Sequence, residues 1–157
     1  MKMNRRSLNI IIIGVVAFIV FKQVRHRYYF SAGMQILQSE LKQAKEERKH
    51  VLLLFTGSDW CAWCVKMDQE VLDTPTFKAY ADEALVVVEA DFPNDKAGQS
   101  EDLQARNRKL RNAFSVNSFP TLLFLDSTGK VVEYQEGYQE GGAEAYVARL
   151  RQKFDAL

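Results

Sequence analysis

The most pronounced feature of the hydrophobic pattern is an apolar stretch near the N-terminus. Residues 8–21, LNIIIIGVVAFIVF, carry no charge, and 10–13 and 15–21 are apolar on every face of a helix. Basic residues precede the stretch, which is the layout of a secretory signal. A membrane-spanning helix needs about 20 apolar residues, so the stretch is short unless it extends through Lys22 to Val24. A buried core helix is the alternative interpretation.

The residues that follow favour a retained anchor over a cleaved signal. Residues 22–30, KQVRHRYYF, are basic and aromatic, unlike the small residues of a cleavage region, although Ser31-Ala32-Gly33 offers a distant site. The aromatic residues 28–30 would suit a membrane interface. We therefore predict export, with 1–32 as a signal peptide or membrane anchor and 33–157 as a separate folded domain.

Beyond residue 32 the pattern alternates between helical and strand periodicity. Met34, Leu37, Leu41 and Ala44 recur at helical spacing within residues 33–49. The other predicted elements are a buried strand over 51–56, a helix opening near 61 and broken at 73–75, a second helical piece to about 80, a buried strand over 84–92, a helix over 100–114, strands over 121–126 and 131–135 joined by a turn at 126–129, and a helix over 142–154. This order predicts an α/β fold with a central mixed sheet flanked by helices, parallel at its centre and antiparallel at one edge.

Charge is divided unevenly along the chain. Residues 1–30 carry six basic residues (Lys2, Arg5, Arg6, Lys22, Arg25 and Arg27) and no acidic one. Since the whole chain has 21 basic and 20 acidic residues, 15 basic and 20 acidic residues remain in 31–157, a net charge of −5. An acidic domain without a basic stripe gives no reason to expect nucleic-acid binding.

The only two cysteines, Cys61 and Cys64, lie three positions apart in SDWCAWCVKM. A zinc site would need four ligands, and the only histidines are His26, in the N-terminal segment, and His50, before the first strand. Covalent haem attachment would need histidine in place of Val65. A structural disulfide across so short a loop would stabilise the fold little. The pattern favours a redox pair, with a structural disulfide or a metal site as less favoured alternatives.

The cysteines follow a buried strand and open a predicted helix. Ser58 or Asp59 can cap this helix, which places Cys61 in its first turn. Free backbone N–H groups and the positive end of the helix dipole stabilise an anion there, so we expect the Cys61 thiolate to be stabilised. Cys64 lies one turn further in, close enough to bond with Cys61.

A distant segment, SFPT, places Pro120 directly before the third predicted strand. With WCAWC after the strand at 51–56, and with the FSVNSFPT and DSTGK segments and Gly137 downstream, residues 34–155 resemble the thioredoxin superfamily. The patterns FTGSDWCxWC, DTPxF and DFP are most similar to exported bacterial thioredoxin-like proteins, including the periplasmic disulfide reductase of the DsbH type. The resemblance implies a thioredoxin fold.

The resemblance also implies separate roles for the residues of the site. Cys61 looks like the exposed nucleophile that attacks a substrate disulfide, and Cys64 looks like the resolving thiol that releases the mixed disulfide. Pro120 looks like the cis proline of the family, with an ordinary trans proline as the alternative. A cis bond would turn the backbone of Phe119 outward, where it could pair with a substrate chain as an added strand.

Two tryptophans are expected to complete the substrate-binding surface. Trp60 would shield one side of the site and contact substrate, although a core aromatic would look the same in sequence. Trp63 would line the groove together with Phe119 and Pro120. No metal is expected, because the chain lacks the further ligands that a zinc site would need, and the proposed redox reaction uses no bound cofactor.

The sequence departs from cytosolic thioredoxins at two places. Ala62-Trp63 replaces their Gly-Pro, and Leu54 and Phe55 stand where they have a buried aspartate that helps to move protons. Glu89 could substitute as a proton carrier, but an orientation toward an edge or solvent is the favoured interpretation. Lys66 could help to hold thiolate charge, although a lysine on a helix is more often solvated.

The combined prediction is a periplasmic thiol-disulfide oxidoreductase that reduces disulfides of other exported proteins and is itself re-reduced by a protein electron donor, which could lie in the membrane. The domain would be either secreted into the periplasm or anchored to the inner membrane. It is expected to be a monomer, because isomerases of the superfamily usually have a dimerisation domain and none is evident here. Alternatives are an oxidase or isomerase, a reductant of cytochrome c apoproteins, and a membrane-tethered binding module or holdase with little turnover.

Overall fold

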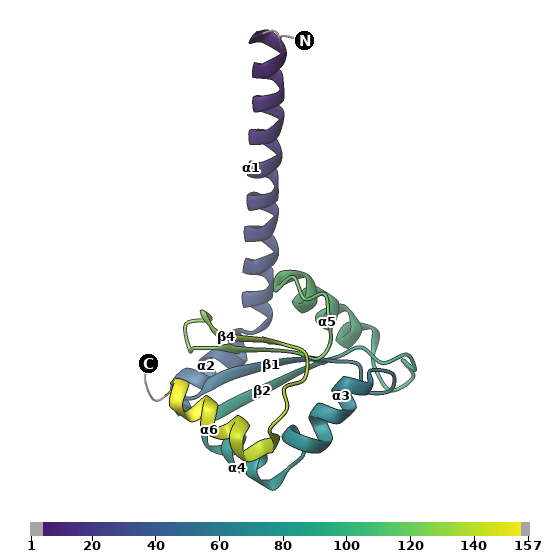
Figure 1. Ribbon diagram of the computed structural model, residues 1–157, viewed down its shortest axis with the longest axis vertical. Helices are drawn as coiled ribbons and strands as arrows, with labels where there is room; N and C mark the ends of the chain where they lie inside the picture. The colour runs from purple at the N-terminus through teal and green to yellow at the C-terminus, as the bar shows by residue number, and fades with distance from the viewer. Residues whose placement is uncertain (1–4, 155–157) are drawn as a thin grey trace.

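A long N-terminal helix, α1 (Arg5–Ile36), projects from a folded domain that contains all the other elements (Figure 1). The computed structural model describes residues 5–154 and, within them, every side chain except those of 5–10 and 26. Lys2 and the side chains of Arg5 and Arg6, which belong to the predicted basic segment, lie outside this description.

Helices and strands alternate along the domain in the predicted order. They are α2 (Gln38–Glu47), β1 (His50–Thr56), α3 (Ala62–Met67), the π-helical turn η1 (Asp68–Leu72), α4 (Pro75–Ala84), β2 (Leu85–Asp91), α5 (Glu101–Ala113), β3 (Thr121–Leu125), β4 (Val131–Glu136) and α6 (Gly142–Phe154). Polar caps fix two of these helix starts. The Thr74 hydroxyl accepts from the Phe77 N–H at the start of α4, and the Ser100 hydroxyl accepts from the Leu103 N–H at the start of α5.

Within residues 5–154, four strands form one mixed sheet in the order β2-β1-β3-β4. β1 pairs parallel with β2, with Thr56 opposite Asp91, and antiparallel with β3, with Phe55 opposite Thr121. β3 and β4 form the antiparallel hairpin predicted around Gly129, whose φ of +86° is a conformation that glycine adopts without strain. The parallel part of the sheet is therefore confined to β1 and β2.

Hydrophobic cores cover both faces of the sheet. On one face α2, α5 and the end of α1 pack against β1 around residues that include Leu37, Val51 and Leu110. On the other face α3, η1, α4 and α6 pack around residues that include Leu52 and Phe124. Strand β1 is buried from residue 51 to 56 because side chains of either face meet a helical layer, which explains its unbroken apolar sequence.

The prediction of a second buried strand over 84–92 is wrong in part, although the favoured interpretation already placed Glu89 at an edge or toward solvent. β2 is an edge strand, and although Val86 and Val88 point into the core, Val87 is 51% exposed and Glu89 is also exposed. The apolar run alone could not reveal this, because the helices cover one face of β2, with Val86 and Val88, along the strand but cover the other face only at Leu85.

The apolar N-terminal stretch and the start of the predicted 33–49 helix are parts of one continuous helix. α1 runs through residue 32 and ends at Ile36, before the fully buried Leu37. Its last turns pack on α5, where a Cβ added to Gly33 would lie 2.4 Å from the Cβ of Ala113. Gly33 therefore allows α1 and α5 to approach closely.

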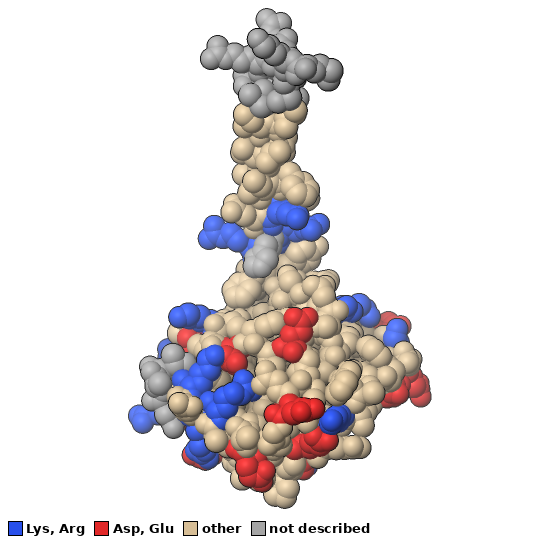
Figure 2. Space-filling model, in the orientation of Figure 1, with Lys and Arg blue, Asp and Glu red and all other residues tan. Residues whose placement is uncertain are grey.

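The outer part of α1 has an exposed apolar surface, which ends at a group of exposed basic residues. Figure 2 shows blue side chains around the helix between its tan upper part and the domain. The exposed basic residues that follow the apolar stretch in α1 are Lys22, Arg25 and Arg27. In the part of the chain that the structure describes, no helix meets the length and hydropathy expected of a membrane span.

The contact between α1 and α5 leads to a prediction for Gly33→Ala. The added methyl group would overlap Ala113, and overpacking of this kind costs about 1–3 kcal/mol, which exceeds the gain of up to about 1 kcal/mol in helix propensity. The free energy of unfolding of the full chain in a mild detergent should fall by about 1–2 kcal/mol. Gly14→Ala is the control, because nothing lies within 4 Å of its added Cβ. Equal effects of the two substitutions would contradict the close packing.

Candidate functional site

The cysteine pair lies at the junction of β1 and α3, and its two sulfur atoms form a disulfide. Cys61 is itself the N-cap of α3, since its sulfur accepts a hydrogen bond of 3.2 Å from the Cys64 N–H. The prediction that Ser58 or Asp59 caps this helix is therefore wrong. Cys61 is 7% exposed and Cys64 is 1% exposed, so Cys61 is the more accessible of the two.

Ser58 and Asp59 instead connect the turn before the cysteines to the end of β2. The Ser58 N–H and hydroxyl donate to the two carboxylate oxygens of Asp91, at 3.0 and 2.7 Å. The carboxylate of Asp59 accepts from the backbone N–H groups of Asn94 and Asp95, both at 2.9 Å, and these bonds lower the pKa of Asp59. These hydrogen bonds attach the cysteine turn to the neighbouring loop.

One side of the site is an aromatic group built from three segments. Trp60 contacts Phe119 edge to face, with ring centroids 5.8 Å apart, and Phe119 stacks on Phe92 at 5.3 Å. The Trp60 indole N–H donates to the carbonyl of Phe92 at 2.7 Å. A Cβ on Gly57 would lie 2.5 Å from the Trp60 ring, so the tryptophan occupies its place only because residue 57 is glycine.

Arg111 of α5 contacts two rings of this aromatic group. Its guanidinium lies 5.3 Å from the ring centroid of Phe119 and 5.7 Å from that of Phe92, and its Nε donates to the carbonyl of Val116 at 3.0 Å. The sequence did not identify Arg111 as part of the site. It is one of several charged residues in α5, and nothing in the sequence distinguishes it from those that face solvent.

Pro120 lies at the start of β3, and the Phe119–Pro120 bond is cis, as the resemblance implied. Since Phe55 is opposite Thr121, the end of β1 and the start of β3 are adjacent. The contact between Trp60 and Phe119 therefore joins the residue before Cys61 to the residue before Pro120. The predicted cysteine and proline segments meet in the fold.

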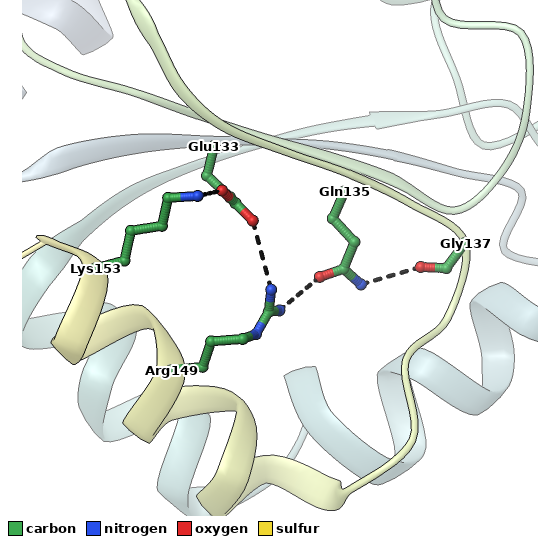
Figure 3. Close-up of polar contacts among 5 residues, drawn as sticks. All are labelled: Glu133, Gln135, Gly137, Arg149 and Lys153. Atoms are coloured by element: carbon green, nitrogen blue, oxygen red, sulfur yellow. Dashed lines mark hydrogen bonds and ion pairs between the residues drawn. The ribbon is translucent and has the colours of Figure 1, made fainter.

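A polar network holds the proline loop from the side of α6. The Gly137 N–H donates to the Pro120 carbonyl at 2.8 Å, and the Gly137 carbonyl accepts from the buried side chain of Gln135 at 3.0 Å. Figure 3 shows Gln135 between Gly137 and Arg149, which donates to its Oε1 at 2.9 Å. Arg149 and Lys153 both pair with Glu133. The hydrophobic pattern did not predict this network. Gln135 is a polar residue within a short strand, and nothing in the sequence shows that its side chain is buried.

The other side of the site is a second aromatic pair. Trp63 is 59% exposed and stacks on Tyr138, with ring centroids 5.9 Å apart. Lys66 lies 4.7 Å from the Tyr138 ring centroid and 5.6 Å from that of Trp63, and it pairs with Glu70. The Tyr138 hydroxyl donates to Glu70, which raises the pKa of Tyr138 to about 12. Tyr138 could not be predicted, because it follows Cys64 by 74 residues in a loop without a motif.

Glu89 does not contact the cysteines through any hydrogen bond in the described part of the chain. Its side chain is exposed on the edge strand, as the favoured interpretation predicted. Loss of hydration and the charges of Asp91, Asp68 and Asp73 raise the pKa of its carboxyl. Lys66 interacts with two aromatic rings and Glu70 rather than with a cysteine sulfur. Within the described residues, no group of three or more potential ligands could hold a metal ion.

The polar network of Figure 3 predicts a cost for Gln135→Leu. The substitution keeps the size of the side chain but removes the partner of the Gly137 carbonyl and one of the two partners of Arg149, which keeps only Glu133, so the free energy of unfolding should fall by about 1–3 kcal/mol. Amide exchange of Gly137 should also become faster, because its bond to Pro120 loses support. Gln152→Leu on the exposed face of α6 is the control. A Gln135→Leu protein as stable as this control would show that the network contributes nothing.

The contact between Tyr138 and Glu70 predicts a specific titration. Carbon-13 NMR of labelled tyrosine rings should show one resonance, absent in Tyr138→Phe, that titrates near pH 12. In Glu70→Gln its pKa should fall toward the ordinary value of about 10, because the carboxylate that stabilises the protonated phenol is lost. Glu46→Gln, on the remote helix α2, should leave the pKa unchanged. A Tyr138 pKa near 10 in the unsubstituted protein would contradict the contact.

Known proteins match this chain across the whole domain. A family profile described as a thioredoxin-like domain matches residues 37–153. The chain is 40% identical over 111 residues to "Disulfide bond reductase DsbH" of Chlamydia pneumoniae, covering 71% of this chain and 66% of that protein. It is 32% identical over 88 residues to "Thioredoxin-related protein DsbJ" of the same organism, covering 56% of this chain and 25% of that protein. The chain thus spans just under two thirds of the first relative and a quarter of the second.

A solved structure supports the same relationship. The "DsbH Oxidoreductase" structure superposes with a TM-score of 0.69 at 36% identity, covering 75% of this chain and 81% of that one. The range matched by the family profile includes both cysteines and Pro120. The chain therefore belongs to the thioredoxin superfamily and, within it, to the DsbH type.

Proposed function

We propose that this chain is an exported thiol-disulfide oxidoreductase that reduces disulfides of other exported proteins. The observation that carries the proposal is the seating of the Cys61–Cys64 disulfide at the start of a helix, beside the cis Pro120 loop. The partially accessible Cys61 would be the attacking residue, and the buried Cys64 would be the resolving one.

The reaction begins from the dithiol form. The Cys61 thiolate attacks one sulfur of a substrate disulfide, so that a mixed disulfide forms and the other substrate sulfur leaves as a thiolate that takes up a proton. The Cys64 thiol then loses its proton and attacks the Cys61 sulfur, which releases the second substrate thiol. Two electrons pass from the chain to the substrate. A donor protein with a dithiol must then supply two electrons to the Cys61–Cys64 disulfide and is itself oxidised.

The surroundings of Cys61 favour the reducing direction. Among the described residues, the one hydrogen bond to its sulfur comes from the Cys64 N–H, and no basic side chain donates to it. The nearby cation Lys66 is engaged by Trp63, Tyr138 and Glu70. The start of α3 and the Cys64 N–H stabilise the thiolate, but no cationic side chain adds to them. Because this stabilisation is limited, the disulfide form is favoured and the dithiol is a good reductant.

Substrate would lie between the two aromatic sides of the site. Trp60, which precedes Cys61 in the sequence, contacts Phe119, and Trp63, which lies between the two cysteines in the sequence, stacks on Tyr138. The backbone of Phe119 would pair with an extended substrate strand, with Pro120 holding the loop in place. Nothing in this arrangement requires a metal or a cofactor, since both electrons reside on the two sulfur atoms.

The proposed location is the periplasm, with the domain either released or attached to the inner membrane by residues 1–32. The support is the exposed apolar surface of α1, followed by the basic residues Lys22, Arg25 and Arg27 and the aromatic Tyr28. A topology reporter fused after Leu157 should be active outside the cytoplasm. Activity confined to the cytoplasm would refute export.

The alternative function is a tethered binding module with little turnover. It is favoured by the exposure of Trp60 and Trp63, which are 49% and 59% accessible and could bind a partner without redox chemistry. A module of this kind would keep its partners after both cysteines are replaced.

Trapping distinguishes the two functions. Cys64→Ala should accumulate mixed disulfides between Cys61 and substrates, because the resolving thiol is missing, whereas Cys61→Ser should trap nothing. The adducts are measured by non-reducing electrophoresis and identified by mass spectrometry after elution with dithiothreitol. Insulin reduction by the unsubstituted full chain should be fast, and it should be lost in Cys61→Ser. Absence of both adducts and insulin reduction would overturn the enzyme proposal.

A further inference from the structure

A pocket of about 610 Å³ lies directly beside the aromatic side of the site. Trp60 and Phe119, which belong to the aromatic side of the site, line it together with residues from the end of β2 and the loop after it, from α5 and from the loop before β3. The pocket thus continues from the surface next to Cys61, where a substrate chain would pass if the proposed function is correct.

The lining of this pocket is basic, although the domain is acidic. Three cationic side chains line it, those of Lys96, Arg108 and Arg111. The lining includes one carboxylate, that of Asp91, and both of its oxygens already accept hydrogen bonds from Ser58. Residues 31–157 carry 15 basic and 20 acidic residues, so this concentration of positive charge is opposite in sign to the net charge of −5.

Two of the cations are free to bind a ligand. In the described part of the chain, no carboxylate pairs with the side chain of Arg108 or of Lys96, whereas Arg106, two residues earlier on α5, pairs with Glu40 at 3.0 Å. Arg108 and Lys96 are both exposed. Their charges are therefore not neutralised within the domain.

The frame of the pocket is fixed before any ligand arrives. Asn107, which is 1% exposed, donates from its side chain to the Asp91 carbonyl at 2.9 Å, and Gln99 donates to the same carbonyl at 3.2 Å. These bonds tie α5 and the loop after β2 to the end of the strand. Arg111 is held by two aromatic rings and by Val116. A framework held in this way loses little conformational entropy on binding, so the cost of ordering is confined to the exposed side chains of Arg108 and Lys96.

We propose that this pocket binds an acidic segment of polypeptide next to the reactive cysteine of a disulfide-bonded partner. Aspartate or glutamate side chains of the partner would pair with Arg108 and Lys96 while its cysteine reaches Cys61. Arginine pairs with carboxylates through two parallel hydrogen bonds, and a basic pocket accelerates the approach of an acidic partner. The inference rests on the proposed function and adds to it a preference among substrates.

The test uses the reduced full chain in a mild detergent and two disulfide-bonded peptides of equal length. One peptide has three aspartates beside its cysteine, and the other has three asparagines at the same positions. The single-turnover rate constant for peptide reduction is measured with the protein in excess, so that each peptide disulfide takes two electrons from one dithiol. At low ionic strength the aspartate peptide should react about 10-fold faster, and this preference should shrink in about 0.5 M salt.

Substitutions in the pocket provide the control. The double variant Lys96→Gln/Arg108→Gln should lose the preference while reducing the asparagine peptide at the unchanged rate. Lys109→Gln, which removes a neighbouring charge of α5 outside the pocket, should keep it. Equal rates on the two peptides, or a preference that survives the double variant, would overturn the pocket proposal alone. Failure to reduce either peptide would instead overturn the proposed function.

Discussion

The site depends on the hydrogen-bond register of strand β1. Pairing with β2 sets Thr56 opposite Asp91, and pairing with β3 sets Phe55 opposite Thr121. The turn that carries Cys61 follows β1 directly, and Pro120 precedes Thr121, so the two neighbours of β1 bring the site together. Because side chains alternate between faces, a shift of one residue would exchange the contents of the two cores. Because both faces of β1 are buried, such a shift is disfavoured. The register that determines the fold therefore also determines the positions of Cys61 and Pro120.

Three supports then hold the segments at the end of β1 in place. Ser58 and Asp59 attach the cysteine turn to the loop after β2. Arg111 holds the aromatic group that includes Phe119, and Gln135 connects the loop after β4 to α6. Each support comes from a different element, so the positions of Cys61 and Pro120 depend on the packing of the whole domain. Such support by surrounding elements is what a preorganised site requires.

The sequence was sufficient for the order of the elements, the fold class and the cysteine and proline segments, because these follow from hydrophobic periodicity and from short motifs. It was not sufficient for features that depend on contacts between segments distant in the sequence. The apolar run of β2 did not reveal an edge strand, and Ser58 and Asp59 looked like helix caps until their partners were visible. Arg111 and Tyr138 reach the site from remote segments, and no local pattern marks such residues.

We propose that the dithiol is a reductant because no cationic side chain adds to the stabilisation that the start of α3 gives the Cys61 thiolate. The most direct measurement is the reduction potential of the Cys61–Cys64 couple in the full chain, obtained by equilibration in graded thiol-disulfide buffers followed by thiol alkylation. For a reductant of this kind the expected value is closer to the about −270 mV of thioredoxin than to the about −120 mV of the strong oxidant DsbA. A value near about −120 mV would mean that the thiolate is strongly stabilised and would contradict the reducing direction.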